Sequence, residues 1–132
     1  MSITVHAYIA VTDLERGIEF YCQALGLSLR RRLDEDWAEL EGATTPIFLL
    51  VRDQPAPRHD NWTVHLDFLT DDLEAATSQA HEAGAALLRD FQERVWGRMA
   101  NMVDPFNNPF DFIELASGGY DRIEYVRDVL RF

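Results

Sequence analysis

Residues 4–15 have the sequence Thr4-Val5-His6-Ala7-Tyr8-Ile9-Ala10-Val11-Thr12-Asp13-Leu14-Glu15, and a near copy returns 59 residues later as Thr63-Val64-His65-Leu66-Asp67-Phe68-Leu69-Thr70-Asp71-Asp72-Leu73-Glu74. Six of the twelve aligned positions are identical, and they include His6 and His65. Repetition at a fixed spacing is typical of a duplicated structural unit. The chain is therefore predicted to contain two equivalent modules.

Each copy is predicted to form a strand followed by a helix, because β-branched and aromatic residues alternate with others before a helical period begins. Side chains on a strand point alternately to its two faces. One face would carry apolar side chains that pack against helices: Ile3, Val5, Ile9 and Val11 in the first copy, and Trp62, Val64, Leu66 and Phe68 in the second. His6 and His65 are therefore expected on the opposite face, away from the main core.

Length and cysteine content suit a compact protein of the cytoplasm. A chain of 132 residues is long enough to bury a core of its own. Cys22 is the one cysteine, so it cannot form an internal disulfide, and this suits a reducing compartment. The sequence shows no signal peptide, and no apolar run approaches the roughly 18 residues of a membrane span. A cytoplasmic location without a membrane partner is expected.

The charge of the chain disfavours nucleic acid as a partner. There are 12 Lys and Arg residues against 23 Asp and Glu residues, which gives a formal net charge of −11 spread along the sequence. Such a charge repels phosphate backbones. The one basic block, Arg30-Arg31-Arg32, is expected to be a solvated strand edge, with an anion-steering patch as the alternative.

The first module is predicted to occupy residues 1–52. A capping box, Thr12-Asp13-Leu14-Glu15, predicts the start of a helix with the Thr12 hydroxyl as its cap, and Gly26 marks the helix end. Three strands are predicted to follow, over 27–34, 36–41 and 46–51. Residues 53–60, which contain two prolines, would link this module to the next.

The second module is predicted to occupy residues 60–116 with the same plan. A strand over 62–69 would precede a helix from Asp72 to about Ala83. Strands would then cover 85–92, 96–103 and 109–116, with a tight turn at residues 104–108. Residues 117–132 would form a C-terminal helical extension, and the whole chain, 1–132, would be a single domain.

This duplicated order resembles the vicinal oxygen chelate superfamily, which includes glyoxalase I, bleomycin-resistance proteins, fosfomycin-resistance enzymes and extradiol dioxygenases. The segments that carry the resemblance are the His6 strand, Asp13 to Tyr21 with Leu25-Gly26-Leu27, the His65 strand with Asp71-Asp72-Leu73, and Trp96-Gly97-Arg98 leading to Asp104-Pro105. Asn107 replaces the glycine of the family's usual Asp-Pro-x-Gly-Asn turn. The resemblance implies an α+β fold, in which two tandem βαβββ modules form a curved mixed sheet around a concave site.

The resemblance also implies one divalent metal ion, with ligands from the first, fifth and eighth strands and often a glutamate from the fourth. His6 and His65 match the first two positions. Counting seven residues from the aspartate of the Asp-Pro turn gives Asp111, which strand parity also favours, with Glu114 as the fallback. Residues 46–51 contain no acid, histidine or glutamine, so at most three protein ligands remain. Iron, manganese, nickel, cobalt or zinc would suit them, and a metal-free protein is the alternative.

Five further side chains are candidates for catalysis or substrate binding. Tyr8 and Asp67 lie one strand step beyond the two histidines on the same faces, where each would orient a ligand or carry a proton. Arg98 would hold an anionic substrate through a bidentate contact, and Trp96 and Phe48 would provide aromatic lining. The alternatives are a surface salt bridge for the arginine and core packing for the aromatic residues.

Two functions remain open from the sequence. The first is metal-dependent lyase, isomerase or dioxygenase chemistry on a small oxygen-bearing molecule. The second is metal-free binding or sequestration of a small molecule, as the resemblance to bleomycin-resistance proteins implies. The resemblance also implies a homodimer, in which His6 of one subunit would serve a site completed by His65 and Asp111 of the partner subunit.

Overall fold

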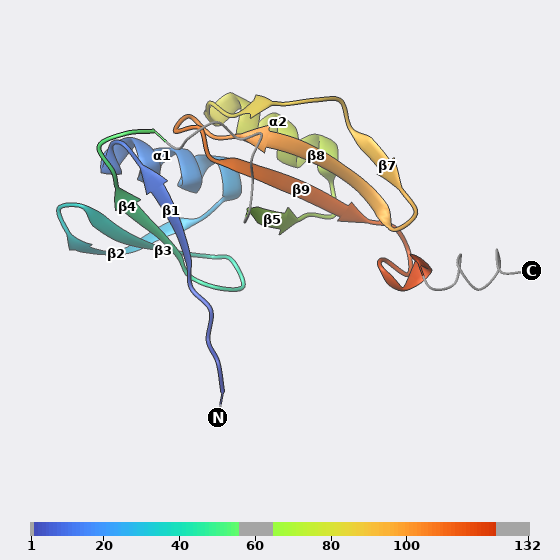
Figure 1. Ribbon diagram of the computed structural model, residues 1–132, viewed down its shortest axis with the longest axis horizontal. Helices are drawn as coiled ribbons and strands as arrows, with labels where there is room; N and C mark the ends of the chain where they lie inside the picture. Colours follow the sequence, from blue (N-terminus) through green and yellow to red (C-terminus); the bar gives the residue numbers. More distant parts are fainter. Residues whose placement is uncertain (1, 56–64, 124–132) are drawn as a thin grey trace, which may run out of the picture.

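The computed structural model describes residues 2–55 and 65–123, which form two similar modules. The first contains β1 (Ala7–Val11), α1 (Leu14–Leu25), β2 (Ser28–Asp34), β3 (Trp37–Glu41) and β4 (Ile47–Val51). The second contains β5 (Leu66–Leu69), α2 (Leu73–Ala83), β6 (Ala86–Leu87), β7 (Gln92–Arg94), β8 (Gly97–Val103) and β9 (Pro109–Leu115), as Figure 1 shows. Across the described residues, no helix has the length and apolar character needed to cross a membrane.

Each module forms its own sheet, and the two sheets share one strand order. β1 pairs in parallel with β4 in the order β1-β4-β3-β2, and β5 pairs in parallel with β9 in the order β5-β9-β8-β6. The short β7 also pairs with β8. β1 and β5 are thus edge strands of their sheets. This repeated order confirms the predicted α+β fold of two βαβββ modules.

Both helices begin at an aspartate of the repeat. Asp13 accepts a hydrogen bond from the backbone amide of Arg16 over 3.0 Å, and Asp72 accepts one from the amide of Ala75 over 3.0 Å. The prediction that Thr12 caps α1 is wrong by one residue. Asp13 has the extended backbone of an N-cap, with φ −149° and ψ 120°, and its short carboxylate reaches the first-turn amides.

The strand predicted over 85–92 is two short strands, β6 and β7. Leu87 pairs with Met102, and Gln92 pairs with Met99. The chain therefore advances five residues from Leu87 to Gln92, while the paired strand β8 advances only three. The two extra residues cannot join the ladder and interrupt the strand, as in a β-bulge.

β1 is shorter than predicted. It begins at Ala7, and Ile3 and Val5 lie before it with 81% and 67% of their surface exposed. His6 therefore lies immediately before the strand. The predicted strand positions 62–64 and most of the predicted C-terminal helix lie outside the described residues, although 121–123 are helical.

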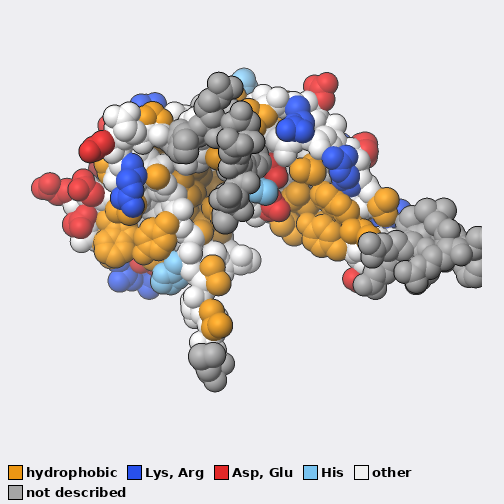
Figure 2. All heavy atoms as spheres, in the orientation of Figure 1, with side chains coloured by type: hydrophobic (Ala, Val, Ile, Leu, Met, Phe, Trp, Pro, Cys, Tyr) orange, Lys and Arg blue, Asp and Glu red, His pale blue; other side chains and the backbone are white. Residues whose placement is uncertain are grey.

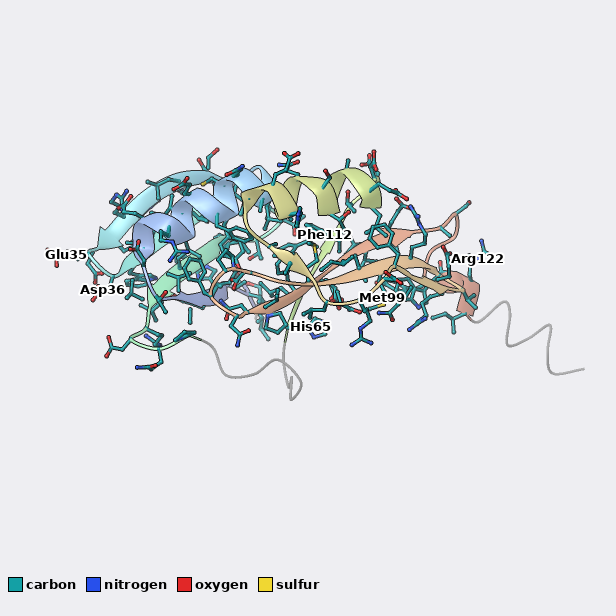
Figure 3. All side chains as sticks on the ribbon, turned by 90° about the horizontal axis from the view of Figure 1, so that it is seen from above. Glu35, Asp36, His65, Met99, Phe112 and Arg122 are labelled. Atoms are coloured by element: carbon teal, nitrogen blue, oxygen red, sulfur yellow. The ribbon has the colours of Figure 1, made fainter. Side chains whose placement is uncertain are left out.

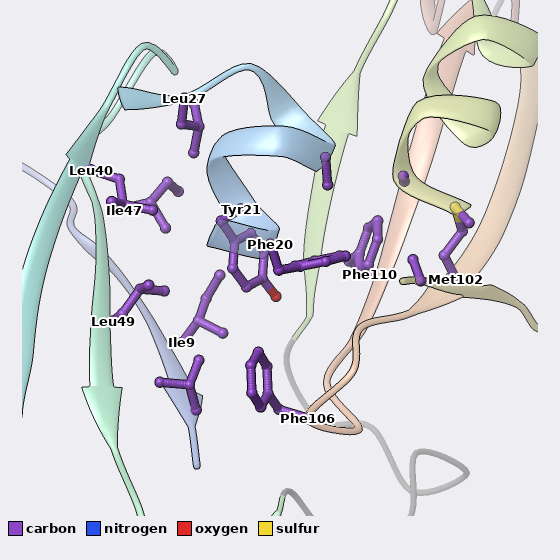
Figure 4. Close-up of a cluster of buried hydrophobic side chains, with 14 of the residues drawn as sticks. Ile9, Phe20, Tyr21, Leu27, Leu40, Ile47, Leu49, Met102, Phe106 and Phe110 are labelled. Atoms are coloured by element: carbon purple, nitrogen blue, oxygen red, sulfur yellow. The ribbon is translucent and has the colours of Figure 1, made fainter. Parts of the chain in front are cut away.

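The core lies between the sheets and the two helices. Figure 3 shows α1 and α2 on one side of both sheets, with Phe112 facing α2 and His65 on the opposite side. Phe20 and Tyr21 of α1 share one buried cluster with Phe106 and Phe110 of the second module (Figure 4). This packing joins the two modules, and among the described residues no helix covers the other face of either sheet.

A buried polar network also joins the modules. The Tyr21 hydroxyl donates to Asp104 in the turn between β8 and β9. Asn108 of the same turn donates from Nδ2 to the carbonyl of Ala10 over 2.7 Å and to Asp104 Oδ2 over 2.9 Å. Burial raises the pKa of Asp104, whereas the hydrogen bonds from Tyr21 and Asn108 lower it. These donors therefore compensate a carboxylate that has been removed from water.

Replacing Tyr21 by Phe is expected to lower the free energy of unfolding by about 1–3 kcal/mol, because Oδ2 of the buried Asp104 carboxylate loses one of its two donors and keeps only Asn108 Nδ2. The pKa of Asp104 would rise further in the folded protein, so the folded state would bind more protons than the unfolded state between the two pKa values. Stability then falls as pH rises through that range, and the loss should be larger at about pH 7 than at about pH 4. Urea denaturation at both pH values measures this difference, and an equal loss at both would contradict the explanation.

Candidate metal centre

Three side chains with metal-binding atoms meet at the start of β5. The parallel register of β5 and β9 places Asp67 opposite Asp111, and His65 precedes Asp67 by two residues. His65 Nε2 lies 3.0 Å from Asp67 Oδ1 and 3.1 Å from Asp111 Oδ2. One ligand atom from each of the three residues lies within 4.8 Å of the others, and within 2–55 and 65–123 no other group of three His, Cys, Asp or Glu residues does so. This spacing fits the ligands of one metal ion.

The two carboxylates of this cluster differ in environment. Asp111 is 3% exposed, whereas the side chain of Asp67 is 43% exposed. Burial raises the pKa of Asp67, the interaction with His65 opposes this rise, and the nearby Asp111 adds to it. The ligand oxygens of Asp67 and Asp111 lie within 4.8 Å of each other, so the two carboxylates repel each other when both are charged. A cation between them would remove that repulsion.

An amide from β8 holds Asp111. Asn101 lies opposite Asp111 in the β8–β9 ladder, and its Nδ2 donates to Asp111 Oδ1 over 2.6 Å. Asn101 Oδ1 accepts from Gln92 Nε2, and Gln92 Oε1 accepts from the Arg94 guanidinium over 2.7 Å. None of these three residues was predicted from the sequence. The one signal for them is a single asparagine in the otherwise apolar middle of β8, where a buried amide needs hydrogen-bond partners.

His6, immediately before β1, and Tyr8 on β1 join an aromatic cluster of the first module. The His6 ring centroid is 4.8 Å from that of Phe48, and the Tyr8 centroid is 4.9 Å from Phe48 and 6.3 Å from Trp37. Within one chain, the group with metal-binding spacing thus contains Asp67 and lacks His6. Figure 2 shows hydrophobic side chains gathered over both sheets on the face opposite α1 and α2.

Arg98 and Glu114 lie on the helix-facing side of the second sheet. Arg98 donates to Glu74 over 2.7 Å and to Glu114 over 2.8 Å. Glu114 Oε2 also accepts from the amide of Leu73, the first residue of α2, over 2.8 Å. The structure therefore places Glu114 at the start of α2 and not beside His65. Both side chains are engaged in holding α2 to the sheet.

Trp96 lies beside the C-terminal turn, with its ring centroid 5.4 Å from that of Tyr120. Trp96 directly precedes Gly97, the first residue of β8. It therefore lies before the start of this strand, whereas the residue of β8 that contacts the metal-binding cluster is Asn101, in the middle of the strand.

A cleft of about 620 Å³ lies beside Asp67. Its walls come from the end of α1, the loop between β3 and β4, β5 and the start of α2. Polar groups on these walls include Asp67, Asp71, Thr44 and Gln79, and apolar groups include Leu27 and Leu69. A cleft of this size and mixed lining is large enough for a small molecule.

Sequence comparison decides the family. A profile of the Glyoxalase-like domain matches residues 6–113, which is most of the chain. The chain belongs to this family. Among curated proteins, no sequence matches the chain significantly.

The glyoxalase-like chain also resembles solved structures. The fosfomycin resistance protein FosX of Listeria monocytogenes has a TM-score of 0.75 and 17% identity, over 92% of this chain and 98% of that one. A glyoxalase/bleomycin resistance protein/dioxygenase from Alicyclobacillus acidocaldarius has a TM-score of 0.68 and 21% identity, over 86% and 91%. A family enzyme from Burkholderia phytofirmans has a TM-score of 0.70 and 18% identity, over 84% and 97%. At these identities the likeness shows the fold, and with the family match it confirms membership of the vicinal oxygen chelate superfamily.

Proposed function

We propose that this glyoxalase-like protein is a metal-dependent enzyme that acts on a small oxygen-bearing molecule. The observation that carries the proposal is the convergence of His65, Asp67 and Asp111 from two neighbouring strands, with one ligand atom of each within 4.8 Å of the others. One imidazole and two carboxylates are suitable donors for manganese, iron, cobalt, nickel or zinc. Because His65 and Asp67 are exposed, an ion held there would keep positions open for substrate.

The residues of the cluster would have two roles, metal binding and proton transfer. A bound divalent ion would supply Lewis acidity to a substrate held through adjacent oxygens. His65, immediately before β5, and Asp111 on β9 would fix the ion, and the sheet gives them a rigid support. Asp67 is the more exposed carboxylate, and within one chain it would complete the ligand set. Where His6 of the partner subunit takes that place, Asp67 would be available to take up and return a substrate proton. These roles fit lyase, isomerase or dioxygenase chemistry.

A homodimer would bring His6 to the same centre. β1 and β5 are edge strands, and Tyr8 and Leu69 on them are 52% and 60% exposed. In a two-fold pair, the first module of one subunit would face the second module of the other, so His6 would add a nitrogen ligand. We place the protein in the cytoplasm, because a single cysteine suits a reducing compartment.

A metal-free binding protein is the second candidate function. The cleft beside Asp67 supports it, because acidic and apolar groups line that cleft together. Such a lining would suit a small organic cation with an apolar body.

Elemental analysis of protein purified without chelator tests the two candidates. The metalloenzyme is expected to contain about one transition metal ion per chain, and added ion should raise the melting temperature of the wild type but not of His65→Ala. His6→Ala would lose part of this response if His6 is a ligand in a dimer. Absence of metal, together with no thermal response to manganese, iron, nickel or zinc, would contradict the metalloenzyme. Stabilisation by organic cations alone would then favour the binding protein.

A further inference from the structure

We infer that Asn101 and Gln92 are positioning residues for the metal centre. A series of hydrogen bonds that all run in one direction, from Arg94 to Asp111, holds the Asp111 carboxylate with Oδ2 turned toward His65. The inference rests on the proposed metal-binding function and assigns it two residues that do not touch the ion.

Asn101 determines the orientation of the Asp111 carboxylate. The terminal torsion of an aspartate has broad minima, so the backbone alone does not decide which oxygen faces His65. Asn101 holds Oδ1 with a bond of 2.6 Å, and Oδ2 is then 3.1 Å from His65 Nε2. Asn101 and Asp111 are 5% and 3% exposed, so water has little access to replace this bond. The amide therefore determines the direction in which the carboxylate points.

The hydrogen bonds of this series all run in one direction. An arginine side chain has donors and no acceptor, whereas a charged carboxylate has acceptors and no donor. Because Arg94 donates to Gln92 Oε1, Gln92 Nε2 is turned toward Asn101 Oδ1. This in turn directs Asn101 Nδ2 to Asp111. Reversal of either amide would place oxygen against oxygen, so the two ends of the series fix both amides.

The sheet places these side chains together. Asn101 faces Asp111 as a cross-strand pair, and Gln92 pairs with Met99, two residues before Asn101 on the same face of β8. The interruption between β6 and β7 sets this register. Beside the interruption, the amide of Leu88 donates to the Asn101 carbonyl over 2.8 Å and holds its backbone. The irregular segment thus delivers Gln92 to the open face that carries the cluster.

Two substitutions separate positioning from simple charge. Asn101→Leu removes the donor to Asp111 at similar volume. Gln92→Glu keeps the shape of the side chain but has no donor, so Asn101 must turn its Nδ2 away from Asp111. Both variants are expected to weaken Mn²⁺ binding by about 10–100-fold, which is typical of residues that orient metal ligands. The added negative charge of Gln92→Glu would by itself strengthen cation binding, so weakening would report the reversed amide.

Two control variants accompany these substitutions. Arg89→Gln, at an exposed position outside the series of hydrogen bonds, changes the net charge by the same amount as Gln92→Glu, so it should bind Mn²⁺ at least as tightly as the wild type. Met102→Leu lies on β8 at 1% exposure and on the face opposite Asn101, and it measures the effect of altered packing in this strand. Melting temperatures without metal show whether each variant is folded.

Titration of Mn²⁺ followed by electron paramagnetic resonance measures the affinities. Wild-type affinity in both Asn101→Leu and Gln92→Glu would overturn the inference. Failure of the wild type itself to bind Mn²⁺, Fe²⁺, Ni²⁺ or Zn²⁺ would remove the proposed function alone. Crystal structures of the wild type and Asn101→Leu would then decide the positioning role. It holds if Asp111 turns away from His65 in the variant, and it falls if the 3.1 Å contact persists.

Discussion

Replacing Asp111 by Asn is expected to weaken divalent metal binding by at least about 100-fold, because the loss of a ligand should cost no less than the loss of a residue that orients one. Asp111 is the buried member of the cluster, and its Oδ2 lies 3.1 Å from His65 Nε2. The substitution keeps the shape of the side chain while removing its charge. Isothermal titration with Mn²⁺ or Zn²⁺ measures the change, and melting temperatures without metal show whether the fold is retained.

Glu114→Gln is the matched control for this prediction. It makes the same change of charge on the same strand, three residues away, but on the face that holds α2 through Leu73 and Arg98. The variant should keep its metal affinity and lose about 1 kcal/mol of stability, because hydrogen bonds to a charged group are replaced by weaker ones. Equal losses of metal affinity in Asp111→Asn and Glu114→Gln would show that general charge, and not the cluster, attracts the ion.

Gly97→Ala is expected to have the largest effect on stability, about 4 kcal/mol or more, a magnitude reserved for changes that the structure cannot absorb. Gly97 has φ +152°, and a Cβ built there lies 2.1 Å from the carbonyl oxygen of Glu114 and 2.9 Å from the Cα of Leu115. Both contacts are backbone atoms of the paired strand β9, so the strands must separate. Because β9 also carries Asp111, metal affinity should fall together with stability. Urea denaturation followed by circular dichroism measures the loss.

Gly26→Ala separates the steric effect from backbone strain. Gly26 ends α1 at φ +69°, and apart from its chain neighbours no atom of residues 2–55 and 65–123 lies within 4 Å of a Cβ built there. A side chain in this left-handed conformation should cost only about 1 kcal/mol. Similar losses for both variants would mean that the contact with β9 is relieved by small shifts, and the explanation for Gly97 would be withdrawn.

Local patterns in the sequence determined the modules and the faces of their strands. The repeat at His6 and His65 predicted the duplication. The capping box at Thr12 and the aspartate at Asp72, each followed by helical periodicity, predicted α1 and α2 within one or two residues. Alternation along a strand also predicted that Asp111 and Glu114 lie on opposite faces, as they do. These inferences succeeded because period and capping are properties of neighbouring residues, which a sequence displays directly.

Tertiary structure decided which residues meet. The parallel register of β5 and β9 joins Asp67 to Asp111 across 44 positions of sequence, and the ladder of β8 and β9 joins Asn101 to the same carboxylate. The interruption before β7 brings Gln92 to that face. The same packing places Arg98 beside Glu114, on the side of α2. Strand order and register depend on contacts between distant segments. The alternation of side chains along a strand is the same for every register that buries the same face, so it does not determine which residues of two strands lie opposite each other. The sequence by itself therefore determined the two modules and the side of the sheet on which a site would lie, and the three-dimensional pairing of strands determined its members.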